Sequence, residues 1–156
     1  LKKKKIVHES NIKIKHISAE TVSSDEFDKL KKSLYACTDL ALVTSGTVVL
    51  ELSKASVPMI VGYRAGFLTE IIYRLFIKIP SANLVNLITK RNDVPEFLFN
   101  RCNSKNFYLQ AKLLLDKKKQ AEAQLISSKQ AIRELGYGSI DPSIRAAKSI
   151  KKFLKL

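Results

Sequence analysis

The sequence predicts an α/β fold in which helices flank a parallel sheet. Two short, continuous apolar runs, at residues 39–45 and 58–63, are typical of strands that are buried on both faces. Segments with helical periodicity precede and separate these runs. Strand–helix–strand alternation at this spacing gives right-handed crossovers and parallel strands. We therefore expect a Rossmann-like parallel sheet with flanking helices.

The first elements are an edge strand and an amphipathic helix. The alternation of apolar residues and lysine in NIKIKHIS (11–18) predicts a half-exposed strand. In residues 24–37, Phe27, Leu30 and Leu34 recur at helical spacing behind an acidic first turn. A helix is expected to begin near residue 24.

The central elements follow without a long loop. The buried strand DLALVTS (39–45) ends at Gly46, TVVLELSKASV (47–57) reads as a helix, and PMIVGY (58–63) reads as the next buried strand. This segment is the strand–helix–strand unit on which the fold prediction mainly depends.

Residues 66–79 (GFLTEIIYRLFIKI) predict a helix with an unusually wide apolar face. Glu70, Arg74 and Lys78 recur every four residues and form one thin charged stripe, while almost all other positions are apolar. Two interpretations stay open: a helix packed between layers or domains, or a surface that contacts lipid or an acyl chain.

The remainder predicts a short strand, a short helix and a helical C-terminal tail. NLVNLI (83–88) reads as a strand and VPEFLF (94–99) as a short helix. Further helices are expected around 105–118, 119–135 and 143–155, with Gly136 and Gly138 between the last two and Pro142 in the first turn of the last. We expect a single, partial domain over 1–156, in which 104–156 forms the C-terminal helices.

Composition limits the class of partner. The 28 Lys and Arg against 14 Asp and Glu give a net charge of +14, which attracts nucleic acid, anionic lipid or phosphorylated ligands without choosing among them. Cys37 and Cys102 are far apart and far from both histidines, so neither a disulfide framework nor a zinc site is indicated. The sequence carries no secretion signal or spanning segment that we recognise, and its start at Leu1 predicts a piece of a longer protein.

Ser45-Gly46-Thr47 is the strongest candidate for a binding element. In an open α/β sheet, ligands bind beyond the carboxyl ends of the strands, where glycine lets the backbone approach a phosphate and hydroxyls can donate to it. Glu51, one turn further, suits a pair of ribose hydroxyls. The alternative is that Ser45 or Thr47 only caps the helix and Glu51 is solvated.

Three segments together carry a family resemblance. TSGTVVLELSKASVPMIVGYR (44–64), FLTEIIYRLFIKIP (67–80) and SANLVNLITKRNDVPEFLFNRC (81–102) resemble the C-terminal region of lipid-A-disaccharide synthase, a glycosyltransferase with two Rossmann-like domains (GT-B). The resemblance covers residues 30–102 in motif detail and the rest in pattern. Transferases and epimerases that use UDP-N-acetylglucosamine share the Ser-Gly-Thr and Glu element, whereas the later segments are more particular to this family.

The resemblance implies a function and a set of site residues. The family transfers an acylated glucosamine from UDP-2,3-diacylglucosamine to lipid X (2,3-diacylglucosamine 1-phosphate), without a metal, at the cytoplasmic face of the bacterial inner membrane. Its C-terminal domain holds the UDP-sugar. By resemblance the residues that line this site are Ser45, Gly46, Thr47, Glu51, Gly62, Tyr63, Arg64, Asn86 and Glu96, of which Asn86 and Glu96 have no assigned role.

The sequence also departs from the family. The amino-terminal domain, which supplies the general base, and the Pro-Gly-Ser-Arg loop have no counterpart, and Asn100 stands where glutamine is usual. The chain alone is therefore expected to be inactive, with a separate N-terminal half or a homodimer as the partner that completes it. The alternative function is a basic module that binds RNA or anionic membrane. Nucleic acid is the less favoured partner, because the sequence has no RNP-like run or GXXG loop.

Overall fold

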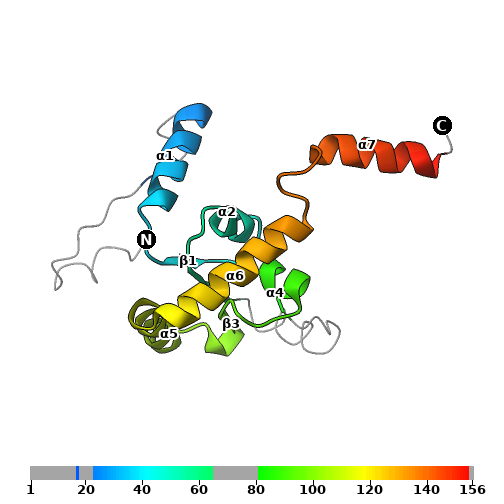
Figure 1. Ribbon diagram of the computed structural model, residues 1–156. Coiled ribbons are helices and arrows are strands. Elements are labelled where there is room, and N and C mark those ends of the chain that lie inside the picture. The colour runs from blue at the N-terminus through cyan, green and yellow to red at the C-terminus, as the bar shows by residue number, and fades with distance from the viewer. Residues whose placement is uncertain (1–16, 18–22, 65–80, 155–156) are drawn as a thin grey trace. The chain divides into compact units, whose positions relative to one another are not determined.

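The computed structural model describes residues 17, 23–64 and 81–154 (Figure 1). The chain forms two compact units, residues 1–34 and 35–156. The strand expected over 11–18 and the helix expected over 66–79 lie outside the described residues, apart from Ile17. Among the helices that are described, none is long and apolar enough to cross a membrane.

Helix α1 (Ser24–Ala36) confirms the helix predicted over 24–37. Ser23 and Glu26 start it with reciprocal bonds: the Glu26 N–H donates to Ser23 Oγ at 3.4 Å, and the Ser23 N–H donates to Glu26 Oε2 at 3.2 Å. Such a capping box satisfies amide groups that the first turn leaves without helical partners.

A parallel sheet of three strands, in the order β1-β2-β3, forms the centre of the second unit (Figure 1). The strands are β1 (Ala41–Val43), β2 (Met59–Tyr63) and β3 (Glu96–Leu98). The α/β class, the strand in 39–45 and the strand in 58–63 are thus confirmed. In the register, Val43 lies beside Val61 and Tyr63 beside Leu98.

The predicted helices of the second unit are also present. They are α2 (Val48–Lys54), α5 (Ser104–Asp116), α6 (Lys118–Glu134) and α7 (Pro142–Phe153). Gly136 and Gly138, at φ of +85° and +83°, separate α6 from α7 as expected. Pro142 lies in the first turn of α7, where its missing N–H costs no helical hydrogen bond.

Two short elements were predicted wrongly. Residues 83–88 do not form a strand but contribute to helix α4 (Leu84–Thr89), which Asn83 caps through a bond from the Val85 N–H. Residues 94–99 do not form a helix but contain β3, followed by a 3₁₀ turn over Phe99–Arg101. In both places the secondary structure is determined by contacts between segments that are distant in sequence, because β3 pairs with β2 and α4 packs against α6.

The core lies between the sheet and the helices α2, α4 and α6. Figure 1 shows α6 running across α2 and α4, and these helices contribute to the same cluster as the inward side chains of β2. Its fully buried members include Val49, Leu52, Met59, Val61, Val85 and Ala131. Because side chains alternate along a strand, Ile60 and Gly62 face the other side of the sheet. There Gly62 meets Phe107 of α5.

Candidate functional site

The three strands end at one edge, which we call the carboxyl edge and define as residues 44–47, 63–64 and 99–101. The in-register pairing of β1 with β2, and of β2 with β3, brings these segments to the same end of the sheet. In open α/β sheets this is the end at which ligands bind. The predicted site residues Ser45, Gly46 and Thr47 follow β1 here, Tyr63 ends β2 and Arg64 follows it.

Gly46 is exposed at the carboxyl edge. Its φ of +145° lies in a region that residues with a side chain rarely adopt. Apart from its two chain neighbours, no heavy atom of the described residues lies within 4 Å of the place where a Cβ would stand. Thr47 then caps α2, but its hydroxyl makes no capping bond. Both residues are exposed. The loop therefore offers its backbone, and the Thr47 hydroxyl, to a ligand.

The Ser45 hydroxyl bonds to a distant segment of the chain. It donates to the carbonyl oxygen of Ala82, which lies 37 residues further along the chain. The hydroxyl has a single hydrogen, so in this structure Ser45 ties its loop to the segment before α4 and offers no donor to a phosphate.

Glu96 bonds to the same segment before α4 that Ser45 contacts. Its Oε2 accepts from the Ser81 hydroxyl at 2.9 Å and from the Ala82 N–H at 3.0 Å. The carboxylate at the start of β3 thus fixes Ala82, and the carbonyl of Ala82 fixes Ser45. This link gives Glu96 the role that the sequence could not assign: it positions the loop that carries Gly46.

Asn83 lies next to this link and is fully buried. Its Oδ1 accepts from the Val85 N–H at 2.8 Å, and its backbone N–H donates to Ser81 Oγ at 3.0 Å. Within the part of the chain that the structure describes, its Nδ2 has no hydrogen-bond partner. Burying an amide donor without a partner costs free energy of folding. The Asn83 Nδ2 group is therefore a hydrogen-bond donor beside this link that no described residue uses.

Glu51 lies one turn into α2 and is half-buried. The Tyr35 hydroxyl donates to its Oε2 at 3.0 Å. Thr47 and Glu51 are four residues apart, so their side chains lie on the same face of the helix. Tyr35 therefore orients a carboxylate that shares a helix face with the open loop.

Gly62 and Tyr63 at the end of β2, and Arg64 after it, have different surroundings. A Cβ on Gly62 would lie 2.3 Å from Phe107 Cζ, so the packing of α5 against β2 accounts for a glycine at this position. Tyr63 is half exposed and makes an edge-to-face contact with Phe99, at 6.4 Å between ring centroids. Arg64 is exposed at the carboxyl edge.

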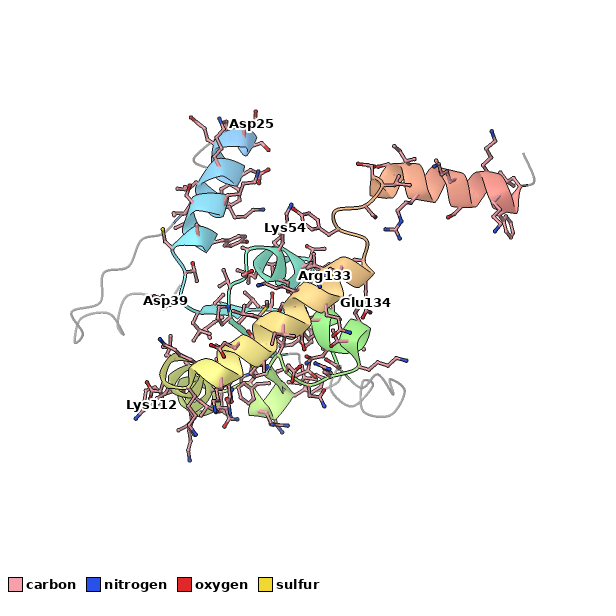
Figure 2. All side chains as sticks on the ribbon, in the orientation of Figure 1. Asp25, Asp39, Lys54, Lys112, Arg133 and Glu134 are labelled. Carbon is pink, nitrogen blue, oxygen red and sulfur yellow. The ribbon has the colours of Figure 1, made fainter. Side chains whose placement is uncertain are left out.

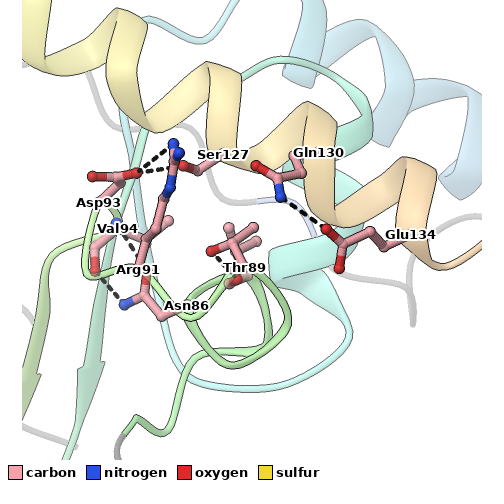
Figure 3. Close-up of polar contacts among 9 residues, drawn as sticks. Asn86, Thr89, Arg91, Asp93, Val94, Ser127, Gln130 and Glu134 are labelled. Carbon is pink, nitrogen blue, oxygen red and sulfur yellow. Dashed lines mark hydrogen bonds and ion pairs between the residues drawn. The ribbon is translucent and has the colours of Figure 1, made fainter.

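Asn86 is buried and structurally engaged (Figure 3). Its Nδ2 donates to the Val94 carbonyl at 2.8 Å, and its Oδ1 accepts from the Val94 N–H at 3.1 Å. Both ends of the amide thus hold the backbone that leads into β3. Asp93, next to Val94, accepts from the Ser127 hydroxyl of α6 and lies 4.0 Å from Arg91, which secures the same turn.

The structure thus links Ser45 to Glu96 through Ala82, exposes Gly46 and Thr47, and attaches Glu51 to Tyr35. Sequence reasoning missed Tyr35, Ser81, Ala82 and Asn83. A signal existed for Asn83, because asparagine before LVNLIT is a good helix cap. Nothing in the sequence pointed to Ala82, which contributes only backbone atoms.

Comparison with known proteins gives consistent results. The family model for lipid-A-disaccharide synthetase matches residues 2–150. The lipid-A-disaccharide synthase of Rickettsia bellii (strain OSU 85-389) is 39% identical over 131 residues, which are 83% of this chain and 34% of that protein. The enzyme of the same name from Rhodospirillum centenum is 36% identical over 123 residues, 79% of this chain and 31% of that protein.

A plant protein is also similar. The probable mitochondrial lipid-A-disaccharide synthase of Arabidopsis thaliana is 40% identical over 108 residues, 69% of this chain and 23% of that protein. The chain therefore spans about a third, or less, of the length of these relatives. No solved structure matches it significantly.

Proposed function

This chain belongs to the lipid-A-disaccharide synthetase family, and we propose that it forms the part of such a glycosyltransferase that holds the UDP of a UDP-sugar donor. The observation that carries the proposal is the open Gly46 backbone at the carboxyl end of β1. The family match supports it independently, because it covers nearly the whole chain. The reaction belongs to lipid A biosynthesis.

The reaction that we propose transfers the acylated glucosamine of UDP-2,3-diacylglucosamine to lipid X. The bond between the sugar C1 and the diphosphate oxygen breaks, and C1 bonds to a hydroxyl oxygen of lipid X. The hydroxyl proton passes to a general base outside these 156 residues, and UDP leaves with the bonding electrons. Negative charge grows on the diphosphate, so donors placed beside it accelerate the step.

The diphosphate is assigned to the loop of Gly46 and Thr47. Among the described residues other than its chain neighbours, none has an atom within 4 Å of the Cβ position of Gly46, which supports close approach of a phosphate oxygen. The Thr47 hydroxyl, which makes no cap bond, can donate to it. Ser45 and Glu96 act indirectly, by fixing this loop through Ala82. The proposed mode of binding uses no metal ion.

The ribose is assigned to Glu51. A carboxylate accepts from two vicinal hydroxyls in the dinucleotide-binding folds, and the Tyr35 hydroxyl would hold it in one orientation. Arg64 and Tyr63, both exposed at the carboxyl edge, are assigned to the sugar-diphosphate. We assign no ligand contact to Asn86, because both ends of its amide hold Val94.

The lipid substrates imply a working position at a membrane surface. We propose a peripheral location at the cytoplasmic face of the bacterial inner membrane, where the net charge of +14 favours anionic lipid. Acceptor binding and the general base are assigned to further polypeptide, in the same chain or in a partner, because the relatives are much longer.

Titration calorimetry with UDP tests the proposal. In Gly46→Val the added side chain would block backbone approach, so we expect UDP binding to be lost. Gly138→Val is the matched control, since Gly138 also has a positive φ and no atom within 4 Å of its Cβ position but lies between α6 and α7. Equal UDP affinity in wild type and folded Gly46→Val would overturn the proposal.

The alternative, a basic module for RNA or membrane, makes a different prediction. Binding to unrelated polynucleotides would then depend steeply on salt and would not change in Glu51→Ala. UDP binding that is lost in Glu51→Ala would favour the transferase. An assay with labelled UDP-N-acetylglucosamine distinguishes the proposed transferase from a sugar-nucleotide epimerase.

A further inference from the structure

Phe99 adopts a backbone conformation that is rare for a bulky residue. Its φ is +53°, in the left-handed region that favours glycine, although it carries a large side chain. It is the first residue of the 3₁₀ turn after β3 and so lies at the carboxyl edge. Residues held in such conformations cluster at functional sites, where the surrounding structure fixes them. The carboxyl edge thus has phenylalanine where glycine would be less strained.

The Phe99 ring is buried and packs against the ring of Tyr63. Phe99 is 7% exposed, whereas Tyr63 is half exposed. The two rings meet edge to face, at 6.4 Å between their centroids and 80° between their planes. This geometry is favourable, because the positive edge of one ring lies against the negative face of the other. A buried ring in close packing restricts how its neighbour can turn, so Phe99 fixes the orientation of Tyr63.

Tyr63 lies on the face of the sheet that carries the candidate site. Side chains alternate along a strand, so Tyr63 shares a face with Met59 and Val61, which pack in one core cluster with residues of α2 and α6. Figure 2 shows the side chains between the sheet and these two helices. Helix α2 begins at the loop of Gly46 and Thr47. That loop therefore leads onto the same face as Tyr63.

The link from Ser45 through Ala82 to Glu96 connects the two strands on either side of β2. Ser45 follows β1, and Glu96 begins β3 beside Val61 in the register. The link therefore crosses β2 near Val61. Tyr63 is the next side chain of this face toward the carboxyl edge, so it stands directly above the link.

The order of the strands brings Tyr63 next to the loop to which we assign the diphosphate. Val43 of β1 pairs with Val61 of β2, and neighbouring strands are about 4.8 Å apart, so the loop and Tyr63 leave the sheet side by side. In a UDP-sugar, the sugar and the ribose are attached to opposite ends of the diphosphate. We assign the ribose to Glu51 on α2, so the end of β2 is the surface that the sugar reaches.

We propose that Phe99 is a positioning residue for the sugar of the donor: it holds the Tyr63 ring so that the glucosamine ring lies against it. One face of a pyranose presents C–H groups, whose positive partial charge is attracted to the negative face of an aromatic ring. A ring that is already held in place loses less entropy when the ligand binds. This inference rests on the proposed function, because it takes the diphosphate to lie at the loop of Gly46.

Titration calorimetry with two probes tests this role. UDP-N-acetylglucosamine carries the glucosamine ring and UDP does not, so the ratio of the two affinities isolates the sugar contact. Tyr63→Leu should lower the affinity for UDP-N-acetylglucosamine about tenfold and that for UDP less than about twofold. Phe99→Leu keeps an apolar side chain at the buried position and should lower the same ratio roughly threefold.

Two further variants separate the ring of Phe99 from its backbone and from Tyr63. Phe99→Gly removes the ring at a φ that glycine adopts without strain, so the turn should form while the ratio still falls. In the double variant Tyr63→Leu/Phe99→Leu, the ratio should fall no further than in Tyr63→Leu alone, because Phe99 acts through Tyr63.

Phe97→Leu is the matched control. Phe97 also forms an edge-to-face pair, with Phe107 at 5.5 Å between centroids. It lies beside Gly62 in the register and therefore on the opposite face of the sheet from Tyr63. Loss of this pair should leave the affinity ratio unchanged.

Three results would overturn this inference while UDP binding stays intact: equal losses for both probes in Tyr63→Leu, a wild-type ratio in folded Phe99→Leu and Phe99→Gly, or the same fall in Phe97→Leu. Each would show that the aromatic pair only supports the fold or contacts the nucleotide. Circular dichroism of each variant checks that it is folded. Failure of the wild type to bind UDP would instead overturn the proposed function, and this inference with it.

Discussion

The side-chain amide of Gln124 on α6 bonds to both backbone groups of Met59, the first residue of β2. Its Oε1 accepts from the Met59 N–H at 2.6 Å and its Nε2 donates to the Met59 carbonyl at 2.8 Å. Gln124 and Met59 are both fully buried. The amide thus mimics a neighbouring strand and attaches α6 to the central strand.

Gln124→Leu should lower the free energy of unfolding by about 3 kcal/mol, because it leaves a buried N–H and a buried carbonyl of Met59 without partners. Urea denaturation followed by circular dichroism measures this. Gln120→Leu, at an exposed position of the same helix, should change the value by less than about 0.5 kcal/mol. Similar losses in the two variants would contradict the role given to Gln124.

Glu96→Ala should affect both stability and the proposed nucleotide site. It removes two hydrogen bonds to a carboxylate, so we expect a loss of about 3 kcal/mol in the free energy of unfolding. UDP affinity should also fall, since Ala82 would no longer hold Ser45. Glu122→Ala, an exposed acid on α6, is the control and should alter neither quantity. Unchanged stability in Glu96→Ala would show that the link is not formed in solution.

Tyr35→Phe tests whether the orientation of Glu51 matters for binding. The variant removes one hydroxyl bond to the carboxylate, and we expect UDP affinity to fall roughly three- to tenfold with a loss of stability of about 1 kcal/mol. Tyr108→Phe, on the exposed side of α5, is the matched control. If UDP affinity is the same in Tyr35→Phe and wild type, Glu51 does not need this partner.

The cap of α7 should respond to acid. The bond from the Ser143 N–H lowers the pKa of Asp141 below its ordinary value of 3.8. A carboxyl whose pKa is lowered by folding stabilises the helix fully above 3.8 and loses this contribution as the pH falls below that value. The Ser143 amide proton shift, followed by NMR, should therefore titrate below pH 3.8. Asp141→Asn should abolish the titration, and a midpoint at or above 3.8 would contradict the assignment.

The sequence predicted the stretch from 39 to 63 well because its signals are local. DLALVTS and PMIVGY are mostly apolar, and the helix between them has the right length for a crossover. The burial expected of both strands is found only in β2, whereas in β1, at the edge of the described sheet, Leu42 is 60% exposed. The two errors fall on six-residue segments. Helix α4 is too short to show a helical period, and β3 is a strand only because β2 lies beside it.

The candidate site was predictable only in part. The openness of Gly46 follows from its residue type and its place after a strand. By contrast, the bond from Ser45 to Ala82 joins positions 37 residues apart and depends on backbone atoms, which leave no residue-type signal. Gly62 is a site residue only by resemblance, and its contact with Phe107, 45 residues further along the chain, could not be predicted from residue type.

The overlap of a Cβ on Gly62 with Phe107 has an evolutionary consequence. A lineage could acquire even alanine at position 62 only after, or together with, a smaller residue at position 107, so these two columns of an alignment should vary together. Glycine would then be retained at position 62 because of the Phe107 ring of α5, and relatives that are no longer catalytic should retain it as well.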